Sequence, residues 1–386
     1  MDTAEQTDLI LHQPGPISDQ ISVTNPITGE EVGRVARSRP SDILASIERA
    51  RRAQPAWGAY PFRERARIFK RFHDLILDRR EELFDVIQAE SGKSRRDAFV
   101  ELFAIAAESR YYAYNGERFL RPRFARTAIP VRDMTRVYHH PAGVVGVISA
   151  WNFPLILSIG DTIPALLAGN AVVLKPSEIT PLTAEWGRAR LIEAGLPEDV
   201  FQIVHGFGPD VGPSLIPNVN YLHFTGSERA GRHIARQAAA HMVPFCLELG
   251  GKNAMIVLDN ADVKHAATVA IEGAFNNAGQ VCITFERLYV HEKVYDRFVA
   301  ELLRQTSALR LGAGRRFDYD IGSLVSTAHA DKIEQHVQDA ISKGVTVLAG
   351  GKRRPDIGPA YFEPTILEGA TSEMLLFAEE TFGPVI

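Results

Sequence analysis

The chain has 386 residues, of which 45% are hydrophobic and 23% are charged, a composition ordinary for a globular protein. This length is more than one hydrophobic core usually organises, so two or three domains are expected. The near balance of 43 basic and 47 acidic residues leaves a net charge of −4 and gives no basic surface for nucleic acid. No apolar run is long enough to cross a membrane, no secretory signal is recognisable, and two cysteines make no disulfide framework, so a cytoplasmic location is expected.

The first third of the chain is expected to be irregular and then helical. Residues 1–40 carry four prolines and indicate an irregular lead-in, whereas apolar residues recur at helical spacing over residues 41–119. Gly92 interrupts that pattern, and a further helix is expected over residues 95–115. Residues 120–140 alternate weakly between apolar and polar and contain two prolines, which favours an extended arm or hairpin.

From residue 144 onward, short β-rich runs alternate with helical stretches. Strands are expected at residues 144–148, 171–174, 201–204, 221–224, 254–258, 288–290 and 345–348. Helices are expected at residues 155–167, 180–194, 227–241, 262–277, 295–309 and 327–343. This alternation predicts an α/β fold with parallel βαβ units, whose sheet binds a ligand at the carboxyl ends of its strands.

One cysteine is presented in a way that suggests a nucleophile. An apolar, helix-like run ends at Phe275 and leads through an Asn-Ala-Gly-Gln turn to Cys282. Upstream, Glu248 ends an apolar strand just before Gly250 and Gly251, where the backbone can approach a ligand closely. A thiol and a carboxylate on two such segments are the groups that covalent catalysis with a general base requires. On spacing alone, a packed structural cysteine and a glutamate in a structural ion pair remain the commoner interpretations.

A further segment offers a place for a phosphate group. Gly226 and Ser227 follow a predicted strand and open a predicted helix that also contains Gly231, so they can place a pyrophosphate at a helix N-terminus. The chain has no G-x-G-x-x-G motif, and Gly206-Phe207-Gly208 with Gly212 misses that spacing by one residue. The residues alone therefore give only a weak indication of a dinucleotide site.

Six segments along the chain share a further likeness. They are Ala150-Trp151-Asn152-Phe153-Pro154-Leu155, Leu174-Lys175-Pro176-Ser177-Glu178, Phe224-Thr225-Gly226-Ser227, Leu247-Glu248-Leu249-Gly250-Gly251-Lys252, Phe275-Asn276-Asn277-Ala278-Gly279-Gln280-Val281-Cys282 and Glu379-Glu380-Thr381-Phe382-Gly383-Pro384. They closely resemble the signatures of the aldehyde dehydrogenase superfamily, and they stand in that family's order. The similarity covers nearly the whole chain from about Asn25 onward. Each motif alone is a weak signal, whereas the six in order are a strong one.

This resemblance implies a set of catalytic residues. Cys282 is the expected nucleophile, Glu248 the expected general base, and Asn152 the expected donor to a developing oxyanion, with the Cys282 amide as second donor. No metal is implied. Glu248 argues against the branches that pass the acyl group to coenzyme A or phosphate, because these generally lack it. The expected product is a carboxylate, formed through a thiohemiacetal and a thioester.

The resemblance also implies a bound dinucleotide, with NAD as the expected cofactor and NADP as the alternative. The residues expected to bind it are Trp151, Lys175, Ser177, Glu178, Gly208, Gly226, Ser227, Gly231, Leu249, Glu380 and Phe382. Glu178 can accept a hydrogen bond from a ribose 2′-hydroxyl and would repel a 2′-phosphate, which favours NAD. Lys175 and Ser177 leave room for NADP.

The family's organisation implies three parts. A Rossmann-like NAD-binding domain is expected from residues 1–119 and 141–247, a small extended oligomerisation arm from residues 120–140, and a second α/β catalytic domain from residues 248–386. The full-length protein is expected to form a homodimer or homotetramer. Family members usually continue well past the position of Ile386, so the C-terminal part of the catalytic domain is expected to be missing.

The expected substrate is a small aldehyde, and its class depends on two positions. The chain looks similar to bacterial enzymes labelled succinate-semialdehyde dehydrogenases, whose substrate carboxylate is held by two arginines. The matching positions here are Gly160 and Asn276, so a substrate carboxylate would lack its cationic partner. The side chains expected to line the pocket are apolar, namely Leu155, Leu157, Ile283 and Phe285. An apolar aliphatic or aromatic aldehyde is therefore expected, with succinate semialdehyde as the alternative.

A function of another class also stays open at this point. A chain without the last part of its catalytic domain is able to bind a dinucleotide without turning over an aldehyde. The intact set of Cys282, Glu248 and Asn152 favours the enzyme.

Overall fold

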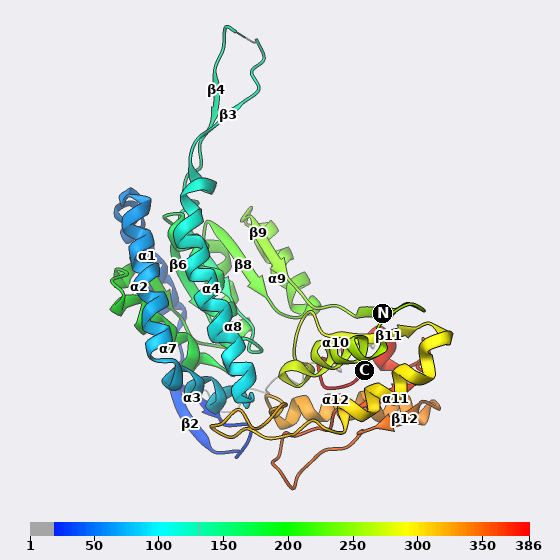
Figure 1. The fold of residues 1–386 in the computed structure, drawn as a ribbon. Helices are drawn as coiled ribbons and strands as arrows, with labels where there is room; N and C mark the ends of the chain where they lie inside the picture. Colours follow the sequence, from blue (N-terminus) through cyan, green and yellow to red (C-terminus); the bar gives the residue numbers. More distant parts are fainter. Residues whose placement is uncertain (1–18, 130) are drawn as a thin grey trace, which may run out of the picture.

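The computed structural model describes residues 19–129 and 131–386, and it contains two large hydrophobic cores. The first core gathers buried side chains between Ile43 and Val243, and the second gathers those between Val257 and Val385. Figure 1 shows the two bodies side by side, with the N-terminal helices and the large sheet in one of them. The predicted α/β fold class is confirmed.

The described chain begins with an antiparallel hairpin of β1 (Gln20–Thr24) and β2 (Glu31–Ala36). The irregular lead-in expected for residues 1–40 is therefore wrong at this hairpin, and its first 18 residues lie outside the described part of the chain. Ile21 and Val23 are buried between exposed neighbours, which is the two-residue period of a strand. The alternation is too short to stand out among the surrounding prolines.

Four helices follow. They are α1 (Pro40–Ala59), α2 (Phe62–Asp78), α3 (Arg80–Ser91) and α4 (Arg95–Leu120). The predicted break at Gly92 is confirmed, because Gly92 ends α3 with a left-handed φ of +73°. The side chain of Ser94 then caps α4 by accepting a hydrogen bond from the backbone amide of Asp97. This cap fixes the first turn of α4, which lies next to the candidate site described below.

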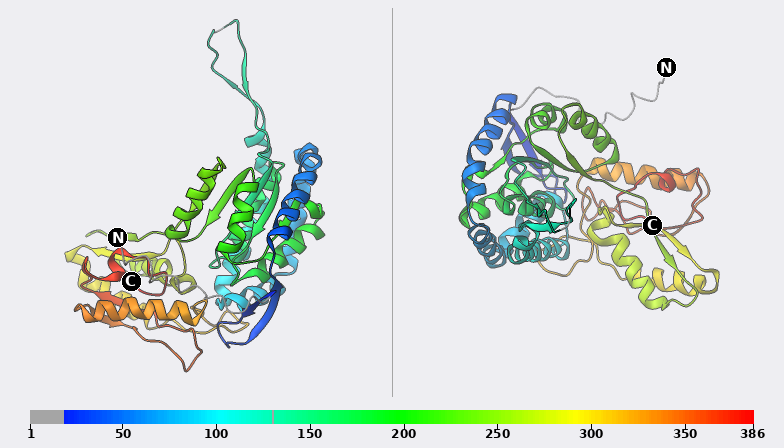
Figure 2. Two further views of the ribbon diagram at one scale, coloured as in Figure 1. Left: turned by 180° about the vertical axis from the view of Figure 1, so that it is seen from behind. Right: turned by 90° about the horizontal axis from the view of Figure 1, so that it is seen from above.

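An antiparallel hairpin of β3 (Arg123–Ala125) and β4 (Thr135–Val137) lies in the segment where an arm or hairpin was expected. Figures 1 and 2 show it projecting away from both bodies. Its apolar side chains Phe124, Val131 and Met134 are exposed. The expected role of this arm in oligomerisation stays a prediction.

A five-stranded parallel sheet forms the centre of the first body, in the order β7-β6-β5-β8-β9. Its strands are β5 (Val144–Ile148), β6 (Ala171–Lys175), β7 (Phe201–Ile203), β8 (Tyr221–Thr225) and β9 (Phe245–Glu248). The longer helices between them are α7 (Pro181–Glu193), α8 (Gly208–Leu215) and α9 (Glu228–Ala240). The predicted parallel βαβ units are confirmed. The strand order reverses between β5 and β8, and such a switch point opens a crevice at the carboxyl ends of the strands.

The single helix expected over residues 155–167 is not formed. The chain instead makes α5 (Pro154–Ser158), a 3-10 turn over Gly160–Thr162, and α6 (Ile163–Leu167). Pro164 lies in the first turn of α6, and a proline has no backbone amide with which to continue a helix from the preceding turn. The apolar spacing was helical, but this break was not recognised from it.

The second body combines helices with two small sheets. Its helices are α10 (Val263–Phe275), α11 (Tyr295–Thr306), α12 (Thr327–Ser342) and the short α13 (Leu375–Ala378). Its strands are β10 (Asn253–Val257) and β11 (Phe285–Val290), which pair in parallel, and β12 (Thr346–Ala349) and β13 (Ile366–Glu368), which pair antiparallel. Phe275, Phe298 and Ile333 are buried at the centre of this body.

The helix expected to run to Asn277 ends at Phe275. Asn277 and Ala278 have positive φ values of 50° and 54°, which a right-handed helix does not allow. Within the two described ranges, no helix combines the length and the apolar character needed to cross a membrane.

Candidate active site

The carboxyl edge of the parallel sheet gathers most of the residues singled out from the sequence. Trp151 and Asn152 follow β5, Lys175 ends β6, Ser227 follows β8, and Glu248 ends β9. These four strands are neighbours in the sheet, so their ends share one edge. Along the outer pair, Thr225 of β8 lies opposite Glu248, and the Gly226 amide donates to the Glu248 carbonyl at 3.0 Å. Candidate catalytic and cofactor-binding residues therefore lie along one edge of the sheet.

A left-handed turn presents Cys282 to this edge. Asn277, Ala278 and Gly279 all have positive φ, and Gly279 must lack a side chain, because a Cβ there would lie 2.1 Å from the Gly383 carbonyl oxygen. Two residues after the turn ends at Gln280, Cys282 is exposed. The turn therefore directs the thiol out of the second core.

A neighbouring strand holds the backbone on both sides of the thiol. The side-chain amide of Asn253, at the start of β10, donates to the carbonyl oxygens of Cys282 at 3.0 Å and Thr284 at 3.1 Å. The sequence pattern did not identify Asn253. It follows Lys252 directly, and a polar residue that opens an apolar strand was the available signal.

The thiol is poorly suited to ionise by itself. Partial desolvation by the surrounding protein raises the pKa of Cys282, and the carboxylates Glu380 and Glu248 raise it further. The resting thiol is therefore protonated at neutral pH, and attack requires a base to take its proton. Glu248 is exposed at the end of β9, where its carboxylate is accessible for that task.

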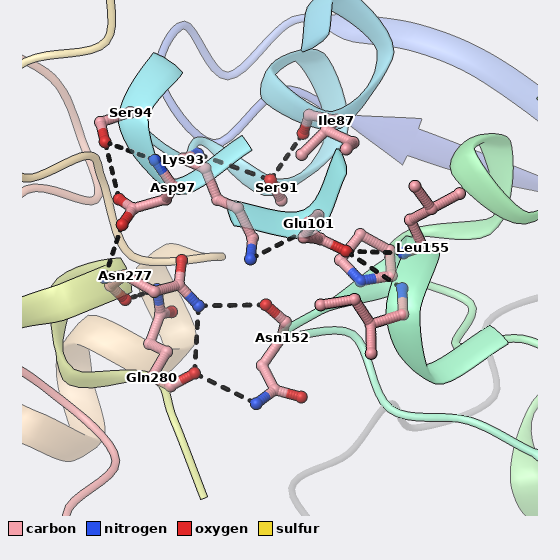
Figure 3. A network of polar contacts seen from close by, with 12 residues as sticks. Ile87, Ser91, Lys93, Ser94, Asp97, Glu101, Asn152, Leu155, Asn277 and Gln280 are labelled. Atoms are coloured by element: carbon pink, nitrogen blue, oxygen red, sulfur yellow. Dashed lines mark hydrogen bonds and ion pairs between the residues drawn. The ribbon is translucent and has the colours of Figure 1, made fainter. Parts of the chain in front are cut away.

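A buried network connects Asn152 with the cysteine-bearing turn (Figure 3). The Asn152 side chain is 4% exposed and donates through Nδ2 to the Gln280 carbonyl at 3.1 Å. Asn277 donates through its own Nδ2 to the carbonyl oxygens of Asn152 and Gln280, both at 3.0 Å. The Gln280 side chain donates to the Asn277 carbonyl at 3.0 Å and accepts from the Val325 amide at 2.9 Å. Asn152 and the segment before Cys282 are thereby held in one fixed relation.

The start of α9 has the features of a phosphate-binding helix terminus. Ser227 caps the helix, with its Oγ accepting from the Ala230 amide at 3.3 Å, and Gly226 precedes it. Gly231 packs against Leu249, because a Cβ at Gly231 would lie 2.6 Å from Leu249 Cδ2. Gly208 opens α8 with free space beside it. Ser227 and Gly208 are thus exposed, Gly226 lies against the Phe224 ring, and Gly231 lets the helix approach Leu249.

Two charged residues follow the same edge at β6. Lys175 is buried, and its Nζ forms an ion pair with Glu178 Oε2 at 2.9 Å. Ser177 is also buried and accepts from the Ile179 amide at 3.3 Å. The ammonium therefore neutralises part of the charge that Glu178 presents.

The segment that carries Glu380 and Phe382 is fixed by buried charges that the sequence analysis missed. Glu286, on β11, accepts hydrogen bonds from the backbone amides of Thr381 at 3.0 Å and Phe382 at 2.9 Å. Its side chain is fully buried and forms an ion pair with Lys252. A carboxylate inside a predicted strand is unusual, and this was the signal by which Glu286 was identifiable.

The Glu380 carboxylate lies against the Gly-Gly segment after β9. Its Oε1 accepts from the Gly251 amide at 3.2 Å, and a Cβ at Gly250 would lie 2.2 Å from its Oε2. Burial raises the pKa of Glu380. The ring of Trp151 lies 5.5 Å from that of Phe382 and 5.3 Å from that of His329. Glu380 therefore lies against the segment that follows β9, and Phe382 lies beside Trp151, which follows β5.

The residues present fit a dinucleotide better than a metal ion. Ser227 opens a helix terminus at α9, and Glu178 and Glu380 offer acceptors for hydroxyl groups, as a nucleotide requires. Among the described residues, no group of three or more histidine, cysteine or carboxylate side chains is arranged to hold a metal.

Leu155 does not line an open pocket as expected. Its side chain is fully buried in the first core, because α5 packs against α4 and α7 there. Ile283, by contrast, is 75% exposed beside Cys282. The missing arginine positions are Gly160, which is buried, and Asn276, which is exposed.

Comparisons with known proteins converge on one family. The model of the aldehyde dehydrogenase family matches residues 15–386. A protein of Mycolicibacterium smegmatis named putative succinate-semialdehyde dehydrogenase [NADP(+)] is 45% identical over 379 residues, which are 98% of this chain and 72% of that protein. The crystal structure of succinate-semialdehyde dehydrogenase from Burkholderia pseudomallei is 34% identical, with a TM-score of 0.91 over 95% of this chain and 76% of that one. An NAD⁺ complex of aldehyde dehydrogenase from Bacillus cereus is 33% identical, with a TM-score of 0.90 over 95% and 75%.

Proposed function

The chain belongs to the aldehyde dehydrogenase family and is an NAD(P)-dependent oxidoreductase, and from this premise we propose that Cys282, Glu248 and Asn152 convert an aldehyde to a carboxylate. One observation carries the proposal. Asn152 Nδ2 donates to the Gln280 carbonyl, two residues before Cys282, so an amide donor and a thiol from different bodies stand together.

The chemistry begins with the thiol. The pKa of Cys282 is raised by desolvation, so Glu248 or a water held by it takes the proton as the sulfur attacks the aldehyde carbon. Asn152 Nδ2 has a second hydrogen beyond the one bonded to Gln280, and this hydrogen together with the Cys282 amide stabilises the oxyanion. A nicotinamide held near Trp151, Leu249, Glu380 and Phe382 would supply the hydride acceptor, and the oxidised acyl group would remain on Cys282 as a thioester. Glu248 then activates the water that releases the carboxylate.

The cofactor-binding residues are proposed from the same edge. Gly226, Ser227 and Gly208 hold the pyrophosphate side, Lys175, Ser177 and Glu178 the adenine ribose, and Trp151, Leu249, Glu380 and Phe382 the nicotinamide side. Gly231 contributes through the packing of α9 on Leu249. We propose NAD as the preferred cofactor because Glu178 would repel a 2′-phosphate. NADP is the alternative, favoured by the Lys175–Glu178 ion pair and by the NADP(+) in the name of the Mycolicibacterium relative.

The proposed assignment of domains follows the family's organisation. Residues 1–119 and 141–247 are proposed as the NAD-binding domain, residues 120–140 as the oligomerisation arm and residues 248–386 as the catalytic domain. The two separate hydrophobic cores support this division. A homodimer or homotetramer is the proposed assembly.

The substrate is proposed to be an apolar aliphatic or aromatic aldehyde. A Cβ at Gly160 would lie 2.6 Å from Glu108 Oε2, so a carboxyl rather than a guanidinium borders this position. Desolvation and the charge of Asp161 raise the pKa of Glu108 to about 7. The alternative is succinate semialdehyde, which is favoured by the names of relatives in Mycolicibacterium and Burkholderia.

The test separates the roles of the thiol and the base. Cys282→Ala should abolish NADH formation while leaving cofactor binding measurable by fluorescence. Glu248→Gln should give a burst of NADH followed by a slow steady rate, because thioester release loses its base. Glu272→Gln, at an exposed carboxylate on α10, is the control and should keep activity. Full steady-state activity in Cys282→Ala or Glu248→Gln would refute the assignment.

A further inference from the structure

Asn277 is buried at the point where the two bodies meet, and its side-chain amide is fully occupied. It is 2% exposed, and its Nδ2 donates to the carbonyl oxygens of Asn152 and Gln280, each at 3.0 Å (Figure 3). The first acceptor belongs to the loop after β5 and the second to the turn before Cys282. One amide group therefore joins the two segments that carry the proposed oxyanion donors.

The backbone of Asn277 is fixed from a third direction. Its amide donates to Asp97 Oδ1 at 3.1 Å, and Ser94 Oγ donates to the other oxygen of Asp97 at 2.7 Å. Both residues stand in the first turn of α4. The carboxylate is thereby held between two donors and cannot rotate without losing one of them.

The same helix also holds the segment after Asn152. Glu101 Oε2 accepts from the amides of Leu155 at 2.8 Å and Ile156 at 3.3 Å, at the start of α5. Lys93 lies 3.0 Å from Glu101 Oε1, and both side chains are buried. The first turns of α4 thus hold the α5 segment and the cysteine-bearing turn in a fixed relation.

The direction of the Asn152 amide depends on this arrangement. One hydrogen of its Nδ2 is used by the Gln280 carbonyl, and that carbonyl also accepts from Asn277. Among the described residues, the second hydrogen of Asn152 Nδ2 has no recorded acceptor, and its direction follows from the first bond because the amide group is planar. A shift of the Gln280 carbonyl would therefore turn the free hydrogen away.

We propose that Asn277 is a positioning residue, which aims the free N–H of Asn152 at the oxyanion by tying the Asn152 and Gln280 carbonyls together. The inference rests on the proposed oxyanion role of Asn152. Asparagine suits the position for two reasons. It tolerates the left-handed φ of 50°, and its NH₂ group supplies two donors where aspartate would face two carbonyl oxygens with acceptors only.

Two substitutions isolate the side-chain amide. Asn277→Gly keeps the left-handed backbone accessible and removes the donors, whereas Asn277→Asp keeps the shape and removes the donors. The matched control is Asn170→Asp, at a buried asparagine whose Nδ2 donates to the Ala165 carbonyl at 2.9 Å far from the thiol. Thermal unfolding identifies any variant that fails to fold. If Asn277→Asp does not fold, the rate of Asn277→Gly decides the test.

The decisive measurement is single-turnover NADH formation with saturating aldehyde. Asn152→Ala should slow it on the order of 10²-fold, as removal of one oxyanion donor does. Both Asn277 variants should slow it by about tenfold or more, because small misplacements of a catalytic group cost that much. Cofactor affinity, measured by fluorescence, should stay within about twofold of the unmutated value. Asn170→Asp should leave the rate unchanged.

A double substitution distinguishes positioning from general destabilisation. If Asn277 acts through Asn152, the pair Asn152→Ala with Asn277→Gly should be no slower than Asn152→Ala alone, since the group being aimed is already absent. The inference is overturned if the rate losses of the two single variants multiply in the double variant, or if the Asn277 variants react at the unmutated rate. In either case the proposed function stands. An unchanged rate in Asn152→Ala would instead overturn the oxyanion role itself.

Discussion

The carboxyl of Glu108, on α4, occupies the space into which a side chain at position 160 would extend. Burial and the neighbouring Asp161 raise the pKa of Glu108 to about 7. Near neutral pH the Glu108 carboxyl is therefore partly ionised, and we expect its negative charge to disfavour a substrate carboxylate. Gly160 makes this placement of the Glu108 carboxyl possible, because a side chain at position 160 would occupy the same space.

The first prediction concerns substrate choice. We expect a medium aliphatic aldehyde to exceed succinate semialdehyde in kcat/KM, and Glu108→Gln to narrow that gap several-fold because it removes the negative charge. Lowering the pH from 8 to 6 should narrow the gap in the unmutated enzyme, since Glu108 becomes protonated below about 7. In Glu108→Gln that pH effect should disappear. A preference of roughly tenfold or more for succinate semialdehyde, about 1.4 kcal/mol, would contradict the prediction.

The second prediction concerns the cofactor. Glu178→Gln should narrow the difference in kcat/KM between NAD and NADP, because repulsion of the 2′-phosphate is lost. The ion pair with Lys175 limits the effect, since part of the charge is already neutralised. Glu198→Gln, at an exposed carboxylate beyond the C-terminal end of α7, serves as control. An unmutated enzyme that prefers NADP would mean that Lys175 dominates this site.

At the scale of elements, the loop after α13 is held more by buried charge than by regular structure. Glu286 on β11 accepts two of its backbone amides and pairs with Lys252, while Lys332 on α12 donates to the Glu380 carbonyl at 2.9 Å. The strand β11, the helix α12 and the residue before β10 thus converge on a segment that forms no helix or strand itself. Its conformation depends on contacts that lie about 50 to 130 residues away in sequence.

The third prediction follows from this loop. Glu286→Gln should raise the KM for the cofactor about tenfold or more and lower the free energy of unfolding by about 3 kcal/mol, because a buried Lys252 is left without its counter-charge. Glu272→Gln, at an exposed position on α10, should change neither quantity. Unchanged cofactor KM and unchanged stability in Glu286→Gln would show that the loop holds its shape without the carboxylate.

The sequence predicted elements well where a local pattern decides them. The strands β5 and β6 are largely continuous apolar runs, and Gly92 marks a helix break that the structure contains. The prediction from sequence failed where contacts between residues far apart in the chain determine the local structure. The left-handed turn at Asn277 depends on Asp97, and the placement of Phe382 depends on Glu286. The candidate site was accordingly identified through its motifs, whereas the residues that hold it in place were not.

At the scale of the whole molecule, the β3–β4 hairpin is the part that packs on neither body (Figure 2). A single two-stranded hairpin gains little stability in water, and this one exposes Phe124, Val131 and Met134. Exposed apolar side chains on a projecting element are typical of an association surface.

The fourth prediction tests that surface. Replacing residues 123–137 by a short Gly-Ser linker should reduce the apparent mass in light scattering, while cofactor binding to the sheet edge is retained. A milder variant, Phe124→Ser with Met134→Ser, should weaken association without changing chain length. Arg132→Ser, at an exposed charged position of the same hairpin, is the control. An unchanged mass in the linker variant would assign association to another surface.

The hydrogen bond between Asn277 and Asp97 joins residues that are 180 positions apart in the chain. During synthesis at about 5–20 residues per second, Asn277 is added on the order of 10–40 seconds after Asp97, whose carboxylate later accepts from its amide. Until then Asp97 lacks the Asn277 amide, whereas Glu101 gains its partners Leu155 and Ile156 much earlier in synthesis. The nucleophile therefore leaves the ribosome last among the catalytic residues, after the sheet edge that receives it has had time to fold. A nascent chain therefore has no assembled thiol site while its first body is still folding.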